Sequence, residues 1–179
     1  MKRSFARNLG WLFVGIFVLL SAGGRTLRAQ VSVEIPKLSA KAGTTVRIPL
    51  NVGDLTGKDV TSFEFVVACD TTLLRFSGID QEKTLSSGSM IFANNHVRPY
   101  GPGKMKVVCA RSQPLTGSGT LVYITGIAQK QNGTSSLRVS NCILNTGTPS
   151  TTVTDGSLTV MLPKAGKYQR LDDSAMTKK

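Results

Sequence analysis

The chain has 179 residues, with 22 Lys and Arg against 10 Asp and Glu, which gives a formal net charge of +12. Ten of the basic residues lie before Gln30 or after Leu162, and the 133 residues between these points carry 12 basic and 8 acidic side chains. No basic helix and no Lys/Arg run interleaved with aromatic residues occurs there, so the charge does not indicate a nucleic-acid-binding protein.

The N-terminal segment has the three parts of a secretory signal peptide. Lys2, Arg3 and Arg7 make a basic start, an apolar run follows over residues 11–22, and Ala29 offers a small residue for cleavage. A transmembrane anchor is the alternative, but only about 12 residues are continuously apolar, whereas a span needs about 20. We therefore expect cleavage after Ala29 and a secreted protein, in the extracellular space, on the cell surface or in the periplasm, with no membrane span.

Residues 30–162 are divided into short segments by Gly, Asn, Asp and Pro, which favour turns. The segments alternate apolar and polar residues or are rich in β-branched residues, and none has a convincing helical period. Nine strands are predicted, at residues 31–35, 45–52, 62–69, 75–79, 90–94, 104–110, 120–128, 136–140 and 157–161. Together they predict one all-β domain, a sandwich or barrel, followed by a polar tail at 163–179 that we expect to be disordered.

The third predicted strand has the clearest two-residue period, which is typical of a strand with one buried face. Its large apolar residues fall on one side, at Phe63, Phe65, Val67 and Cys69. Its remaining residues fall on the other side, at Ser62, Glu64, Val66 and Ala68. Farther along the chain, Asn132-Gly133 is the strongest turn signal and predicts a β-hairpin that leads into residues 136–140.

Three cysteines follow Gln30, namely Cys69, Cys109 and Cys142. An oxidising compartment would allow one disulfide among them, and the sequence does not determine which pair forms it. The alternative is that all three are small buried hydrophobic residues. A metal site is not expected, because His96 is the only histidine and no CxxC spacing occurs.

Five segments, taken in order, carry a resemblance to a known family. They are Val-Ser-Val-Glu-Ile with Ala-Gly-Thr-Thr-Val-Arg-Ile-Pro-Leu-Asn-Val (31–52), Ser-Phe-Glu-Phe-Val-Val-Ala-Cys-Asp-Thr-Thr-Leu-Leu-Arg-Phe (62–76), Gly-Lys-Met-Lys-Val-Val-Cys-Ala (103–110), Gly-Ser-Gly-Thr-Leu-Val-Tyr-Ile-Thr (117–125) and Asp-Gly-Ser-Leu-Thr-Val (155–160). Together they resemble a cohesin domain, the bacterial module that binds dockerin-bearing enzymes. Cys69 and Cys109 stand where the family often has aromatic residues, and Thr71 replaces a turn proline.

The resemblance implies a nine-stranded jelly-roll sandwich whose partner docks on the sheet of the third, fifth, sixth and eighth strands. It also implies that calcium belongs to the dockerin partner and that this chain holds no cofactor. Alternation along three of these strands then selects the outward residues as the partner site: Ser62, Glu64, Val66, Ala68, Lys106, Val108, Ala110, Arg111, Arg138 and Ser140.

The outward residues also have the composition of a protein interface. A small apolar strip is predicted at Val66, Ala68, Val108 and Ala110. Charged residues would rim it, at Glu64, Lys106, Arg111 and Arg138. An apolar centre with a polar rim is typical of interfaces, and the alternatives are a weakly hydrophobic exposed face or one covered by a loop.

The sequence offers no catalytic constellation, since no pair of carboxylates stands out and His96 lies in a Pro/Gly loop without a nucleophile pattern. We therefore expect a non-catalytic module that recruits a dockerin-bearing partner, with polysaccharide degradation as the expected setting. A carbohydrate-binding module of the same fold is one alternative, although signal cleavage removes Trp11 and leaves three tyrosines for sugar stacking. A structural or adhesive domain of the cell envelope is the other.

Overall fold

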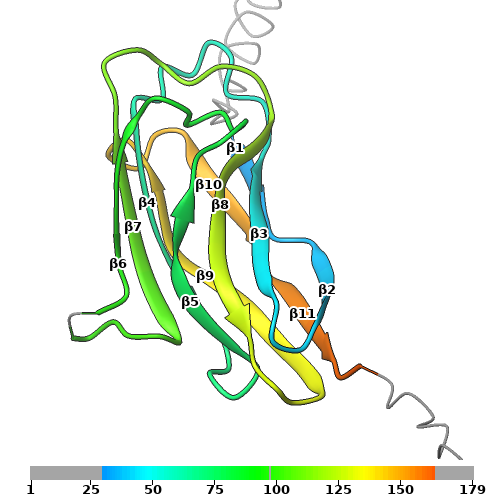
Figure 1. Cartoon of the computed structure of the whole chain (residues 1–179). Helices are drawn as coiled ribbons and strands as arrows, with labels where there is room; N and C mark the ends of the chain where they lie inside the picture. Colours follow the sequence, from blue (N-terminus) through cyan, green and yellow to red (C-terminus); the bar gives the residue numbers. More distant parts are fainter. Residues whose placement is uncertain (1–29, 97, 164–179) are drawn as a thin grey trace, which may run out of the picture.

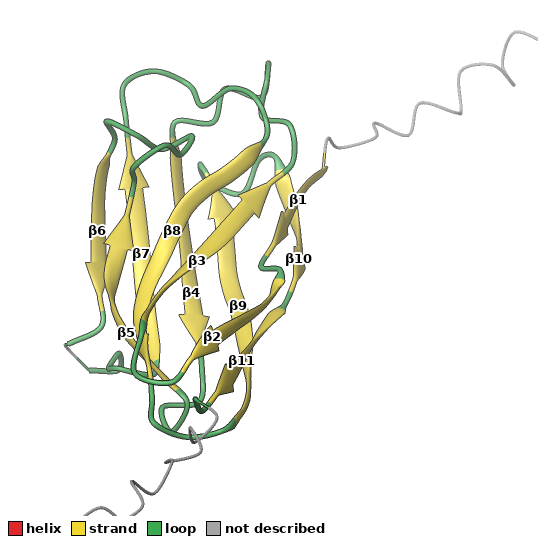
Figure 2. Cartoon of the chain, turned by 45° about the vertical axis from the view of Figure 1, so that its right-hand side comes forward, coloured by secondary structure: helices red, strands yellow, loops and turns green. Residues whose placement is uncertain are grey.

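The computed structural model describes residues 30–96 and 98–163, which form eleven strands in two sheets. No helix occurs among these residues, and so none of them belongs to a helix long enough to cross a membrane (Figure 2). The predicted signal peptide at residues 1–29 and the predicted tail at residues 163–179, except for Pro163, lie outside the described residues.

The two sheets face each other as the layers of a sandwich (Figures 1 and 2). The smaller sheet has the spatial order β10 (Ser150–Thr154), β1 (Gln30–Glu34), β3 (Thr45–Val52), β8 (Gly119–Ala128) and β5 (Leu74–Asp80). The larger sheet has the order β2 (Lys37–Lys41), β11 (Gly156–Met161), β9 (Gly133–Leu144), β4 (Ser62–Ala68), β7 (Lys104–Ala110) and β6 (Met90–Asn94). Only the β1–β10 and β2–β11 pairs are parallel.

The predicted all-β sandwich is confirmed, with eleven strands instead of nine. The two added strands, β2 and β10, continue β1 and β11 across the edge of the sandwich, so that each long strand has one half in each sheet. The breaks fall at Ile35-Pro36 and at Asp155. Pro36 has no backbone N–H for a sheet ladder, and Gly156 lets the two crossing segments approach closely, because a Cβ there would lie 2.5 Å from the Ile35 carbonyl oxygen.

The core lies between the sheets and contains the predicted inward side of β4. Phe63, Phe65 and Val67 are at most 2% exposed and belong to one buried cluster with residues of the opposite sheet, such as Ile48 and Ile124. The rings of Phe63 and Phe65 stack with their centroids 6.2 Å apart. The two-residue period therefore assigns the faces of this strand correctly.

The predicted hairpin at Asn132-Gly133 is wrong. β8 and β9 belong to different sheets, so residues 129–132 carry the chain across the sandwich. Both edges of β8 are occupied by β3 and β5, and both edges of β9 are occupied by β11 and β4, which leaves no edge for a hairpin pairing. Asn132 instead accepts a hydrogen bond from the Leu162 N–H at 2.6 Å, and Gly133 begins β9.

All three cysteines are free thiols, and the strand register keeps them apart. Cys109 pairs with Phe63. Cys69 lies six residues after Phe63, which is about 20 Å away along the strand direction. Cys142 precedes Ile143, which pairs with Glu64 on the other side of β4 from Cys109, so two strand spacings of nearly 5 Å each separate these two thiols. Since a disulfide needs Cα atoms within about 7 Å, none of the possible pairings is formed in this structure.

Candidate functional site

β9, β4, β7 and β6 lie side by side in the larger sheet (Figure 1), and we name the surface of their outward residues the β9–β6 face. The register aligns them in rows across the strands. Four rows follow one another: Ser62–Ala110–Met90, then Ile143–Glu64–Val108–Phe92, then Ser140–Val66–Lys106–Asn94, and finally Arg138–Ala68–Lys104. The structure thus brings together nine of the ten predicted site residues, and the tenth, Arg111, directly follows β7.

Three further residues give this face most of its exposed apolar surface. Phe92 is 67% exposed, Met90 is 66% exposed and Ile143 is 37% exposed. With Val108, they account for four of the seven large hydrophobic side chains that are exposed in the described part of the chain. The sequence predicts a strand that contains Met90 and Phe92 but no role for them in the partner site. It predicts that the strand before Ile143 ends at Ser140, whereas the observed β9 continues through Ile143.

Val66 differs from its predicted place in an open apolar strip, because only 4% of it is exposed. It does not belong to the core cluster, so its burial comes from the outer side of the sheet. Lys106 lies directly opposite Val66, and its ammonium reaches back to Glu64 on the same face. The aliphatic stem of Lys106 thus starts directly beside Val66, a position from which long cationic side chains often cover apolar surface.

Two of the four predicted rim residues form an ion pair with each other, and the other two form none with any described residue. Lys106 Nζ lies 2.9 Å from Glu64 Oε2, and this hydrogen bond to the carboxylate raises the pKa of Lys106. Arg111 donates from Nη1 to the Leu85 carbonyl oxygen at 3.2 Å. Arg138 and Lys104 take part in none of the three ion pairs formed by residues 30–96 and 98–163.

A shallow hollow of about 440 Å³ continues the β9–β6 face beyond the row of Ala110 and Met90. Besides these two residues it is lined by Gly88, Arg111 and Ser112. The Arg111 Nε–H is buried there and meets no acceptor among the described residues. The hollow therefore combines apolar walls with a cationic group at the end of the face.

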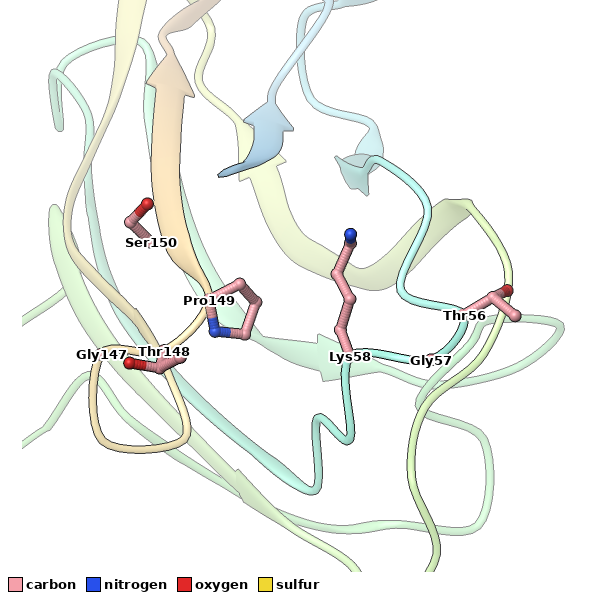
Figure 3. Close-up of a pocket in the computed structure, with 7 residues that line it drawn as sticks. All are labelled: Thr56, Gly57, Lys58, Gly147, Thr148, Pro149 and Ser150. Carbon is pink, nitrogen blue, oxygen red and sulfur yellow. The ribbon is translucent and has the colours of Figure 1, made fainter. Parts of the chain in front are cut away.

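A second pocket of about 450 Å³ lies between the β3–β4 and β9–β10 loops, near the start of β1 (Figure 3). It is lined by Thr56, Gly57, Lys58, Gly147, Thr148, Pro149 and Ser150. Lys58 extends between the two loops and is the one titratable side chain in this lining. A lysine with hydroxyl groups, but without a carboxylate or thiol among the lining residues, provides no acid–base pair for catalysis.

Metal chemistry has no visible basis in the described segments, where no three His, Cys, Asp or Glu side chains converge. The cysteines are poor nucleophiles, since burial raises the pKa of Cys69 to about 12 and that of Cys142 to about 11. The β9–β6 face therefore offers exposed apolar side chains and cationic groups, which are typical of a binding surface.

Comparison with known proteins gives a family match and a set of structural likenesses. The family model described as the cohesin domain matches residues 31–160. A non-cellulosomal cohesin from the archaeon Archaeoglobus fulgidus is 15% identical, with a TM-score of 0.61, covering 74% of this chain and 92% of that chain. A chain from a type I cohesin–dockerin complex of Clostridium thermocellum is 13% identical, with a TM-score of 0.63, covering 78% and 99%.

A further solved structure, the seventh ScaB type I cohesin from Pseudobacteroides cellulosolvens, is 17% identical with a TM-score of 0.61, covering 78% of this chain and 98% of that chain. At these identities the likenesses show a shared fold. No curated protein matches the sequence.

Proposed function

The chain belongs to the cohesin domain family, and from this premise we propose that it binds a dockerin-bearing partner through the β9–β6 face. Cohesin domains are non-catalytic protein-interaction modules, so the chain is not an enzyme. Several structures with the same fold are described as complexes of a cohesin with a dockerin. Their partner class is the reason to propose a dockerin here.

The row Ile143–Glu64–Val108–Phe92 is the observation that carries the choice of face. Three of its four members are exposed apolar residues on three different strands. A stable monomer gains nothing from exposing them together, whereas an interface gains binding energy from burying them. Charged residues border the row, as in the rim of a typical interface.

We also propose that the protein is secreted and acts outside the cytoplasm, in recruiting enzymes for polysaccharide degradation. The basic and apolar segments of residues 1–29 support export, and the family supports the recruiting role. We propose that the dockerin alone binds the calcium. Capture of the partner should therefore require calcium, although this chain would supply none of the calcium ligands.

The test is capture of the purified protein by a panel of immobilised dockerin modules in the presence of calcium. Val108→Asp should abolish capture, because it places a carboxylate in the apolar row. Ile127→Asp is the matched control, since Ile127 is a similarly exposed aliphatic residue, 48% exposed, on the opposite sheet. A chelator should release the bound protein. Equal effects of the two substitutions would exclude the β9–β6 face.

Two alternatives are outcomes of the same experiment. Retention on cellulose or chitin without capture by any dockerin would indicate a carbohydrate-binding module. The face supplies little for sugar stacking, because Phe92 is its one strongly exposed aromatic residue among those described. On the opposite sheet, the guanidinium of Arg47 covers the Tyr123 ring at 4.1 Å. Failure to bind either class would favour a structural or adhesive domain of the envelope.

A further inference from the structure

We infer that Arg138 and Lys104 form a cationic clamp that selects a protein partner carrying an Asp or Glu side chain opposite Ala68. This inference rests on the proposed docking function and specifies the chemistry of the partner. It concerns one end of the β9–β6 face, next to the apolar residues and separate from them.

The register places the two cations symmetrically about Ala68. Ala68 on β4 pairs with Arg138 on β9 and with Lys104 on β7. Since neighbouring strands lie nearly 5 Å apart, the two cationic residues begin about 10 Å from each other. The side chain of Ala68, which is half-buried, is a single methyl group and occupies little of the space between them, so a carboxylate above Ala68 comes within reach of both long side chains.

The clamp has no carboxylate of its own. Glu64 is the one acidic residue in the four rows, and Lys106 already binds it at 2.9 Å. Asp155 lies nearby at the edge of β9, where its carboxylate accepts a hydrogen bond from the Val139 N–H at 2.9 Å. Arg138 and Lys104 are both exposed and form no ion pair within the described part of the chain. The face therefore carries an excess of positive charge.

The clamp and the apolar row define a spacing that the partner must match. Ala68 follows Glu64 by four residues on β4, which corresponds to about 13 Å along the strand. A complementary partner thus presents an apolar surface over Phe92 and Val108 and a carboxylate about 13 Å farther along the strand direction, above Ala68. Charge complementarity of this kind discriminates between partners and accelerates their association.

A displayed library of dockerin modules, randomised at surface positions and sorted against the purified protein in calcium, tests this inference. Enriched clones should carry more Asp and Glu at the randomised positions than the unsorted library. The tightest clone should lose tenfold or more in affinity towards the double variant Arg138→Glu/Lys104→Glu, and its association rate should fall as salt concentration rises. Arg75→Glu, an exposed arginine on β5 of the opposite sheet, is the matched control.

Replacing the responsible Asp or Glu of the clone by Lys should restore binding to the double variant. Clones that bind without acidic enrichment, or that bind the double variant as tightly as the parent protein, would overturn the clamp and leave the proposed function intact. Absence of any binding clone would overturn both. Retention of the protein on polygalacturonate, lost in the double variant while dockerin binding is unchanged, would assign the cations to an acidic polysaccharide and also overturn the inference.

Discussion

Lys106 on β7 and Glu64 on β4 are joined by a salt bridge of 2.9 Å, which connects the row Ile143–Glu64–Val108–Phe92 to the next row on the side of the cationic clamp. Both side chains are 34% exposed, and Lys106 pairs in the register with the buried Val66. Neutralising Glu64 would release the ammonium and add one free cation to the face. The bridge therefore links the local packing of the sheet to its charge.

Glu64→Gln should lower the pKa of Lys106 towards the ordinary value, because the carboxylate that raises it is gone. Since the pKa of Lys106 is raised in the folded state, the salt bridge stabilises the fold below the unfolded pKa of Lys106. This stabilisation is lost as pH rises through the folded pKa. NMR titration of the Lys106 side chain at alkaline pH measures the change. Glu82→Gln, which removes the partner of Lys83, should leave the Lys106 titration as it is, and an equal shift would disprove the assignment.

Two phenylalanines on opposite faces of the larger sheet should differ in what their replacement by Ala impairs, which is stability for Phe65 and partner binding for Phe92. Phe65 is 1% exposed and lies in the core, so Phe65→Ala should cost about 3–5 kcal/mol of unfolding free energy. Phe92 is 67% exposed, so Phe92→Ala should change stability by less than about 0.5 kcal/mol. It should nevertheless weaken dockerin binding about tenfold or more.

Urea unfolding and binding calorimetry on the same samples separate these effects. A large loss of stability in Phe92→Ala would show that this residue supports the fold, and unchanged binding would remove it from the interface.

The alternation of β4 determined both faces of that strand because its core side holds two Phe and its outer side holds polar and small residues. The outer strands were harder to interpret. β6 offers Met90, Phe92 and Ala93 in a five-residue strand, with Met90 and Phe92 exposed, so hydrophobicity alone does not distinguish its inner face from an interface. Only the register with β7 places Phe92 beside Val108.

The missed strands and the wrong hairpin have a common cause in tertiary pairing. β2 and β10 contain mostly polar or small residues, and each is defined by a parallel pairing with a segment more than 100 residues away in sequence. Asn132-Gly133 has a local turn preference, but the neighbouring strand edges were already occupied. Local sequence carries no information on such distant partners.

The three cysteines should remain reduced and react slowly in the native protein. Burial raises the pKa of Cys69 to about 12, of Cys142 to about 11, and also raises that of Cys109, so little thiolate exists near neutral pH. A thiol reagent should modify all three rapidly only after unfolding in denaturant. Detecting a single thiol in denaturant, and three after adding a reductant, would reveal a disulfide and contradict the register.

Acid should weaken the turn that follows β4. The Asp70 carboxylate accepts hydrogen bonds from the Thr72 N–H at 2.9 Å and from its hydroxyl at 2.8 Å, and these bonds lower the pKa of Asp70. Because the pKa of Asp70 is lowered in the folded state, its carboxylate stabilises the fold above the unfolded pKa, which is near 3.8. This stabilisation is lost as pH falls through the folded pKa.

Asp70→Asn should therefore be less stable than the parent protein at neutral pH, and the difference should shrink below about pH 4. Thermal unfolding across this range measures it, with Glu34→Gln as a control on an exposed residue of β1. A difference that does not depend on pH would show that the charge of Asp70 is unimportant to the turn.

Gly156 marks the point where the two long strands cross between the sheets, and Gly156→Ala should be strongly destabilising. The added Cβ would lie 2.5 Å from the Ile35 carbonyl oxygen and 2.7 Å from the Pro36 carbonyl oxygen, and neither backbone group can move without disturbing β1 or β2. Overpacking of this kind costs about 1–3 kcal/mol. Gly101→Ala is the control, since its Cβ would meet no atom within 4 Å. If urea unfolding gave equal midpoints for both variants, the crossing would not be the tight contact described, and the break between β10 and β11 would need a cause other than the close approach of Gly156 to the Ile35–Pro36 segment.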